Sequence, residues 1–462
     1  MSPSLRPPAP PEPARDRADA DRPGVAVKRV LLIAYAFPPV GGAGVQRATK
    51  FVKYLPLAGW SPSVLTVANP SVPVTDESLG ADVPGSTIIR RARTWEPSYA
   101  LKSVVSAGSD RPDRGRLGLR RAAKGLARRL ANLLLQPDAQ VLWMPGAIRE
   151  GEALLREIPH AAIVATAPPF SSFLVGATLS RRTGVPLVLD YRDEWDLSGA
   201  HLENRRPDPL SRSLQVRMQA RAIRAAKALV ATTRASARTL ESLRAGAGGE
   251  ARVTWIYNGF DPDDFPPDTP RPEPGGRYRL AYVGTLWNLT SAAPLVAAVR
   301  ELARSRPDLV SDLELVFAGR RTGPQQQLLD GLDDLPCRVV EHPYVGHREA
   351  IDLLRSADGL CLLLADVPGA GRVVPAKLFE YMAARRPILA IAPRGEVWEL
   401  LEGHPSGYPA DPGDIMGIAG WLAQEIRRRR EGGPPDPGDW DCSRYDRSNQ
   451  ARQLADLLDS IR

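Results

Sequence analysis

The stretch PGAGRVVPAKLFEYMAARRPILAIAP, residues 368–393, decides the fold, because it reads as a loop, a helix, a turn and a strand in succession. Gly369 and Gly371 give the loop backbone freedom, and Pro375 sets a dihedral angle that suits the start of a helix. We predict a helix over residues 377–384 and a buried strand over residues 388–391, which are uniformly apolar. A helix followed closely by a buried strand is typical of α/β proteins.

The same stretch carries a candidate site. A glycine-rich loop that leads into a helix suits an anion, because unpaired N–H groups and the helix dipole point to one place. Arg372 and Lys377 add positive charge there, and Glu380 could accept hydrogen bonds from sugar hydroxyl groups. We therefore predict a nucleotide-sugar site, with the diphosphate at the helix start and the ribose on Glu380. The structural alternative is an ordinary helix–strand unit with a solvated glutamate.

The composition is that of a globular protein, with 43% apolar and 25% charged residues in a chain of 462. The net charge of +8 favours anionic partners such as nucleotides, nucleic acid or anionic lipid, although a general richness in arginine would produce the same value. The three cysteines lie far apart without a CxxC pair, which favours a reducing compartment and predicts no metal site. No run of 18 apolar residues and no signal-peptide core is visible, so we expect a cytoplasmic protein, with the inner face of the membrane as an option.

The N-terminal part begins with a polar tail, residues 1–26, which we predict to be disordered. A strand over residues 27–34 then leads through YAFPPVGGAGVQ into a helix over residues 45–57, a design that binds phosphate. We assign substrate contacts to Gly41, Gly42 and Gly44, with a plain tight turn as the alternative. Arg47 stands where the dinucleotide fingerprint has its third glycine, which argues against a nicotinamide enzyme.

A basic segment follows at residues 111–135, with eight Lys or Arg residues, one acid and a stripe of leucines. Such a helix can lie on an anionic membrane surface or cover the sheet with a solvated basic face, and both interpretations stay open. Nucleic-acid binding is disfavoured because no aromatic residues are interleaved with the basic ones.

The strand predicted at residues 186–190 delivers charged residues to its carboxyl end, where open α/β sheets form their crevice. We predict that Asp190 and Arg192 bind substrate and that Asp193 contacts the acceptor or handles its proton. The five histidines do not mark a site, and we expect each of them to be an ordinary surface residue.

A second α/β array begins after a stretch rich in Pro, Asp and Gly, which predicts a domain boundary. We expect an N-terminal domain over residues 27–257, a linker over 258–277, a C-terminal domain over 278–440 and a final segment over 441–462 that packs back on the first domain. The predicted strand at residues 280–284 ends in Gly284 and Thr285, and the strand at 313–318 leads to Arg320. The overall prediction is two Rossmann-like domains that face a cleft.

Several phrases, in this order, resemble the family-4 retaining glycosyltransferases of the GT-B fold. They are YAFPPVGGAGVQ, KFVKYLPLAGWSPSVLTV, ATAPPFSS with VLDYRDEW, NGFDPDDF and PAKLFEYMAARRPILA, and the resemblance spans roughly residues 27–458. It implies a donor nucleoside diphosphate-sugar, a glycan, lipid-linked or small-molecule acceptor, no metal cofactor and a role in polysaccharide biosynthesis. The acceptor would bind the first domain, and the donor would bind the second domain through Gly284, Thr285, Arg372, Lys377 and Glu380.

The chain also departs from this family. Arg372 replaces the glutamate that many members have eight residues before the ribose-binding one, and Thr285 and Ser291 replace an Arg/Lys pair. The loop at residues 167–172 lacks the histidine of other members. We predict that Arg320, Arg372 and Lys377 supply the missing positive charge and that Lys377 and Arg320 stabilise the leaving diphosphate. A non-catalytic nucleotide-sugar module and a GT-B sugar-nucleotide epimerase are the alternatives.

Overall fold

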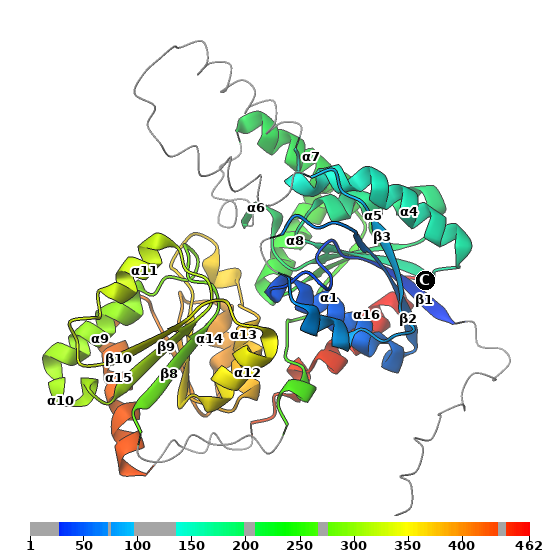
Figure 1. Cartoon of the computed structure of the whole chain (residues 1–462). Coiled ribbons are helices and arrows are strands. Elements are labelled where there is room, and N and C mark those ends of the chain that lie inside the picture. The colour runs from blue at the N-terminus through cyan, green and yellow to red at the C-terminus, as the bar shows by residue number, and fades with distance from the viewer. Residues whose placement is uncertain (1–26, 73–74, 97–134, 198–207, 267–275, 433–439) are drawn as a thin grey trace, which may run out of the picture.

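The computed structural model describes residues 27–72, 75–96, 135–197, 208–266, 276–432 and 440–462. Two parallel sheets, each covered by helices, lie side by side (Figure 1). The predicted α/β class with two Rossmann-like domains is confirmed.

The N-terminal domain is built on a seven-stranded sheet in the order β3-β2-β1-β4-β5-β6-β7, in which every pairing is parallel. Its strands are β1 (Lys28–Ile33), β2 (Trp60–Val67), β3 (Ile88–Ala92), β4 (Ala162–Ala167), β5 (Leu187–Tyr191), β6 (Ala228–Ala231) and β7 (Arg252–Trp255). Its helices are α1 (Ala43–Tyr54), η1 (Leu55–Ala58), η2 (Glu77–Asp82), η3 (Ala139–Trp143), α4 (Met144–Glu157), α5 (Ser171–Thr183), α6 (Trp195–Leu197), α7 (Pro209–Ala225) and α8 (Arg234–Ala247).

The C-terminal domain has a six-stranded parallel sheet in the order β10-β9-β8-β11-β12-β13. Its strands are β8 (Tyr278–Val283), β9 (Leu313–Ala318), β10 (Arg338–His342), β11 (Gly359–Leu363), β12 (Ile388–Ile391) and β13 (Gly407–Ala410). Its helices are α9 (Ala293–Ser305), α10 (Pro307–Val310), α11 (Gly323–Asp330), α12 (His347–Ser356), η6 (Ala370–Arg372), α13 (Lys377–Ala383), α14 (Glu396–Leu401) and α15 (Ile415–Glu431).

The sheets are buried on both faces because helices cover them from both sides. All residues of β4, β5, β9 and β12 are buried, which explains why these strands are mostly apolar in sequence. The exceptions are the buried polar residues Thr166, Asp190 and Glu314. The helix predicted at residues 377–384 is α13, which ends before Arg385 with its φ of 53°. Strand β3 was not predicted, because it is an edge strand in which half-buried and exposed residues alternate over IIRR before the buried Ala92.

The chain crosses between the domains twice. The first crossing leaves β7 and passes through η5 (Pro262–Asp264), and the second passes through η7 (Ser443–Tyr445) into α16 (Arg447–Ser460). Helix α16 lies beside α1 (Figure 1), and Leu454 and Leu458 join Phe51 and Val52 in the N-terminal core.

The strand order places a crevice in each domain. In both sheets the order reverses beside the first strand, at β1/β4 and at β8/β11, and ligands bind outside the carboxyl ends of the strands at such points. The loops that follow these strands therefore carry the candidate site.

Candidate active site

A cavity of about 240 Å³ lies between the two domains. The N-terminal domain contributes residues from the start of α1 and from the segments that follow β4, β5, β6 and β7. The C-terminal domain contributes Leu289 and the segment that follows β11. The wall consists of Gly44, Arg47, Pro168, Arg192, Asp193, Glu194, Thr232, Ser236, Asn258, Leu289, Ala370, Val373, Val374, Pro375, Ala376 and Arg447. Loops that are distant in sequence thus meet at one place.

Arg47 and Asp190 form the rear of the N-terminal wall. Arg47 donates from Nε and Nη2 to the Asp190 carboxylate at 2.8–3.1 Å, and Thr166 Oγ1 donates to Asp190 Oδ2 at 2.8 Å. Asp190 is only 1% exposed. The prediction that Asp190 binds substrate is therefore not supported, because the carboxylate is buried and already occupied by Arg47.

Arg192 connects two loops of the same wall. Its guanidinium donates to the backbone oxygens of Gly44, Ala167 and Pro168. A side chain at Gly44 would press against this guanidinium, because a Cβ there would lie 3.1 Å from Arg192 Nη1. Arg192 therefore positions the glycine loop, which is a different role from the predicted substrate contact.

Asp193 is the most exposed member of the predicted group, and Arg192 lines the cavity beside it. The Asp193 side chain is exposed and lines the cavity. The surrounding protein reduces its hydration and raises the pKa of Asp193, while the neighbouring Arg192 acts in the opposite direction. A carboxyl group with a raised pKa in a cleft can accept a proton.

The glycine loop after β1 leads into α1 as predicted. Gly42 precedes the helix with a φ of 97°, which a residue with a side chain rarely adopts, and Gly41 is half-buried beside it. Of the three predicted glycines, Gly44 is the one that lines the cavity.

Lys377 lies over the loop that follows β8. Its Nζ donates to Tyr282 Oη at 3.2 Å and stands 4.4 Å from the centre of the Tyr282 ring. A side chain at Gly284 would collide with this ammonium group, so the glycine is required for the close approach. Thr285 is exposed, and its carbonyl accepts from Tyr282 Oη at 2.9 Å. The structure thus brings Lys377, Gly284 and Thr285 together.

The other two predicted cations, Arg320 and Arg372, share no contact partner with Lys377 among the described residues. Arg320 is exposed after β9 and has no ion pair with any residue that the structure describes. Arg372 is paired across the cleft with Glu194, at 3.0 Å from Nε to Oε1 and 2.9 Å from Nη2 to Oε2. The charge of Arg372 is therefore compensated in this structure by the opposite domain.

Glu380 is half-buried, and its carboxylate accepts no hydrogen bond from the described part of the chain. Burial raises the pKa of Glu380, while the charges of His347 and Arg447 act in the opposite direction. A carboxylate without internal partners is free to accept hydrogen bonds from a ligand.

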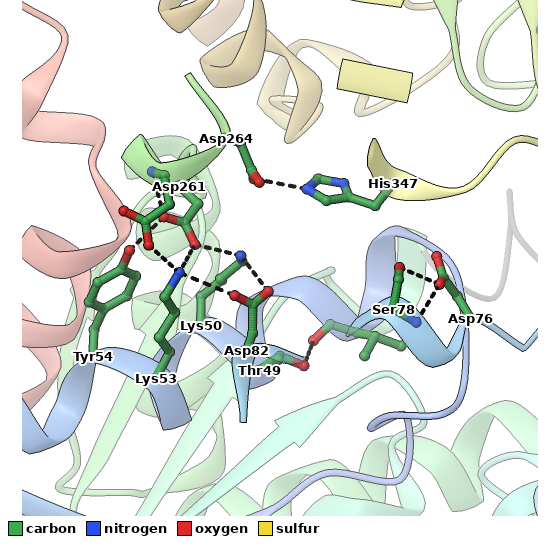
Figure 2. Close-up of polar contacts among 12 residues, drawn as sticks. Thr49, Lys50, Lys53, Tyr54, Asp76, Ser78, Asp82, Asp261, Asp264 and His347 are labelled. Atoms are coloured by element: carbon green, nitrogen blue, oxygen red, sulfur yellow. Dashed lines mark hydrogen bonds and ion pairs between the residues drawn. The ribbon is translucent and has the colours of Figure 1, made fainter. Parts of the chain in front are cut away.

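The histidine prediction is wrong for three residues. His160 and His404 are buried. His347 Nε2 lies 2.8 Å from Asp264 Oδ2 (Figure 2), and the charge of His347 influences Glu380. The pattern of the sequence could not reveal this, because Asp264 is 83 residues away.

The first crossing between domains is anchored by charges. Asp261, 3% exposed, accepts from Lys50 and Lys53 of α1 at 2.5 and 2.7 Å and from Tyr54 Oη at 2.5 Å (Figure 2). Lys50 also pairs with Asp82 at 2.6 Å. The start of the linker is thereby fixed to the N-terminal domain.

A second set of contacts joins the domains near the cavity. Glu396 of α14 accepts from the backbone N–H groups of Arg234 and Ala235, each at 2.8 Å, and from Tyr257 Oη. Thr233 Oγ1 donates to the Arg372 carbonyl at 2.9 Å. Glu396 thus caps the first turn of α8 from the other domain, which sequence reasoning missed because the partners lie 161 and 162 residues apart.

Three further observations concern metal ligands, membrane-spanning helices and the basic segment. The described residues contain no cluster of three or more His, Cys, Asp or Glu arranged to hold a metal ion. None of the helices in the described ranges is both long and apolar enough to cross a lipid bilayer. The basic segment predicted to contact a membrane falls outside the described residues, apart from Leu135.

Two family models match the chain. The glycosyl transferase 4-like domain matches residues 90–259, and the glycosyl transferases group 1 model matches residues 277–426. A search of curated protein sequences found no match.

The fold is shared with solved structures of low sequence identity. HepE of Anabaena, in complex with UDP-glucose, is 16% identical, with a TM-score of 0.57 over 94% of this chain and 99% of that one. The lipopolysaccharide outer core galactosyltransferase WaaB is 12% identical, with a TM-score of 0.54 over 94% and 99%. The trehalose 6-phosphate synthase of Burkholderia multivorans is 13% identical, with a TM-score of 0.55 over 94% and 99%.

Proposed function

We propose that this chain, a glycosyltransferase with the GT-B fold, transfers a sugar with retention from a nucleoside diphosphate-sugar to an acceptor in the interdomain cavity. The observation that carries the proposal is that Lys377 and Glu380, on the helix that begins directly after the cavity-lining Ala376, have no ion pair with any described residue. Two opposite charges that the fold leaves uncompensated fit a ligand with an anionic part and hydroxyl groups.

The donor is assigned to the C-terminal wall. Lys377 would hold the diphosphate over Gly284 and Thr285, and Glu380 would accept hydrogen bonds from ribose hydroxyl groups. The N–H groups of Ala376 and Lys377 have no backbone acceptor within the described ranges and are available to phosphate oxygens. Exposed Arg320 remains available as a further cation for the leaving group. HepE, which shares the fold, was solved with UDP and with UDP-glucose, which supports this donor class.

The transfer step follows from this arrangement. The bond between the anomeric carbon and the diphosphate oxygen breaks, and its electron pair leaves with the diphosphate, whose growing charge Lys377 stabilises. The acceptor hydroxyl oxygen forms its bond to the anomeric carbon on the same face of the sugar. Its proton passes to the leaving diphosphate or to Asp193, whose pKa is raised by reduced hydration.

The acceptor is assigned to the N-terminal wall around Asp193 and Pro168. A glycan or a lipid-linked sugar of polysaccharide biosynthesis is the acceptor class that we propose. A lipid-linked acceptor would accord with membrane contact through residues 111–135 and with action at the inner face of a cell membrane.

Calorimetry and thermal shift against UDP-, GDP- and dTDP-sugars test the donor assignment. We expect one donor to stabilise the wild type by about 2.7 kcal/mol at a hundredfold excess over Kd. Glu380→Ala and Lys377→Ala should lose this shift. The matched controls Glu402→Ala and Lys227→Ala, at exposed positions, should keep it.

Three results would redirect the proposal. If no nucleotide-sugar shifts the wild type, the transferase assignment fails for this cavity. If a donor binds but no sugar is released or transferred to any offered glycan or lipid-linked acceptor, a binding module is favoured. Conversion of the donor into its epimer would indicate the epimerase alternative.

A further inference from the structure

Arg447 is a buried cation whose position the two domain crossings fix. Phe260 N donates to Tyr445 O at 3.2 Å, and Arg447 N donates to Phe260 O at 3.0 Å, so the linker and the return segment run as a short parallel pair. Gly259 allows this approach, since any side chain there would collide with the Tyr445 carbonyl and the Gln450 amide. The first residue of α16 is thereby held at the cavity wall.

The Arg447 side chain has almost no internal compensation. It is 5% exposed and lines the cavity, and its Nη1 donates to Gln450 Oε1 at 3.0 Å. No carboxylate of the described residues lies within ion-pair distance of its guanidinium. Arg47 lines the same cavity with equal burial, but it is fully paired with Asp190.

The surroundings of Arg447 disfavour the charged form of its guanidinium. Burial lowers the pKa of Arg447 to about 10, and repulsion from Arg47 adds to this effect. The more distant carboxylates of Glu380, Asp261 and Asp190 offset only part of it. A buried charge without a direct partner destabilises a folded protein, and an anion that entered the cavity would relieve the cost.

We propose that Arg447 binds a phosphate group in the interdomain cavity, as a ligand contact supplied by the C-terminal helix. A planar guanidinium binds two phosphate oxygens at once, which suits a diphosphate. The inference rests on the proposed function in one respect, because it takes the phosphate to be that of the donor. The phosphate of a lipid-linked acceptor presents the same chemistry, and the experiment separates these two sources.

The test compares Arg447→Gln and Arg447→Lys with Arg452→Gln, a control at an exposed position of the same helix. Calorimetry would measure binding of UDP, GDP and dTDP, of the corresponding nucleosides, of inorganic diphosphate and of farnesyl phosphate. We expect Arg447→Gln to weaken nucleoside diphosphate binding at least tenfold and to leave nucleoside binding within twofold. Arg447→Lys should weaken it at least threefold, and Arg452→Gln less than twofold.

The nucleoside arm separates a phosphate contact from an indirect effect. If Arg447 acted only through the nearby Glu380, binding of the nucleoside would fall as much as binding of its diphosphate, and the inference would be overturned. It is equally overturned if Arg447→Gln binds nucleoside diphosphates, inorganic diphosphate and farnesyl phosphate within twofold of the wild type. If Arg447→Gln does not fold, the threefold criterion for Arg447→Lys decides.

The same measurements separate failure of the Arg447 phosphate contact from failure of the proposed donor site. Loss of nucleotide binding in Lys377→Ala with normal binding in Arg447→Gln overturns the inference alone. If the wild type binds farnesyl phosphate but no nucleotide, and Arg447→Gln loses that binding, the donor assignment fails while the phosphate site stands. A wild type that binds none of these phosphates overturns both.

Discussion

The two walls of the interdomain cavity differ in how their charges are treated. On the N-terminal side, Arg47 is paired with Asp190, and Arg192 donates to three backbone oxygens. On the C-terminal side, neither Lys377 nor Glu380 has an ion pair with another described residue. The difference teaches that the first wall is a frame held by its own contacts, whereas the second leaves charges that a ligand can compensate.

Chemically similar residues therefore have different consequences when they are replaced. Removal of a paired charge leaves its partner buried without compensation and destabilises the fold. Removal of an unpaired charge should leave the fold intact and affect ligand binding. The predictions below follow this contrast from the largest expected loss of stability to the smallest.

Asp190→Asn should cause the largest loss, because Arg47 would remain buried without its anionic partner. We expect the free energy of unfolding to fall by about 3–5 kcal/mol, measured by urea denaturation. Asp196→Asn, at an exposed position, serves as the control and should change it by less than about 0.5 kcal/mol. A loss of under about 1 kcal/mol for Asp190→Asn would show that the Arg47–Asp190 pair does not stabilise the N-terminal wall.

Asp261→Asn should lower the free energy of unfolding by about 2 kcal/mol. This loss is smaller than that of Asp190→Asn, because Lys50 keeps its second partner Asp82. Although burial alone would raise the pKa of Asp261, hydrogen bonds from Lys50, Lys53 and Tyr54 lower it overall. A carboxyl group with a lowered pKa stabilises the fold above its unfolded pKa, about 3.9, and loses this effect as the pH falls through its folded pKa. The difference in the free energy of unfolding between variant and wild type, measured by urea denaturation, should therefore be constant from pH 6 to 8.

The control for Asp261 is Asp263→Asn, which removes the exposed partner of Lys53 in the same cluster. Its loss should stay below about 1 kcal/mol. Equal losses for both substitutions would contradict the view that burial makes Asp261 the anchor of the linker.

Glu396→Gln should weaken the contact between the domains by about 1 kcal/mol, because an anion is lost from the first turn of α8. Differential scanning calorimetry of the whole chain would detect a lower midpoint. Glu399→Gln removes a carboxylate that pairs with Arg234 in a more exposed position and should have a smaller effect. If Glu399→Gln lowered the midpoint more than Glu396→Gln, the exposed pair of Glu399 with Arg234 would be the main contact between the domains.

His347→Gln should destabilise the protein by about 0.5–1 kcal/mol at acidic pH only. Burial lowers the pKa of His347, but the Asp264 hydrogen bond, the Asp264 charge and Glu380 together raise it overall. Such a group stabilises the fold below its unfolded pKa, about 6.5, and the effect is lost as the pH rises through the folded pKa. Urea denaturation of variant and wild type at pH 5.5 and 9 would show whether the difference shrinks, with His342→Gln as the control.

Lys377→Met should have the smallest effect on stability, below about 1 kcal/mol, because it removes a cation–π contact and one hydrogen bond but no ion pair. The side chain of the introduced methionine retains the packing of the lysine methylene groups. Urea denaturation would measure this value, and calorimetry with the donor would measure the expected loss of affinity. A loss as large as that of Asp190→Asn would remove the contrast between the two walls.

Much of the fold was predictable from local pattern. The mostly apolar stretches at residues 313–318 and 388–391 became β9 and β12 without a change of bounds, because strands buried on both faces are rich in apolar residues. Lys377 and Glu380 could be predicted as neighbours for the same reason of locality, since they stand three residues apart in one helix. Gly284 lies 93 residues before Lys377 and was grouped with them only through the family resemblance. The edge strand β13 (GYPA) was missed, because an edge position does not require a continuous apolar run.

The sequence by itself determined the α/β class with its two Rossmann-like arrays, because each strand and helix depends on neighbouring residues. The domain bounds and the loops assigned to the site stay predictions. Only the tertiary structure decided the partner of each charge. Asp190 and Glu194 stand four residues apart in one charged stretch, yet Asp190 holds Arg47 within its own domain and Glu194 holds Arg372 of the other. Arg372 and Lys377 looked equivalent as cations, and only the packing of the domains left Lys377 unpaired. Burial and long-range pairing fix which charges are neutralised, and neither is encoded in local spacing.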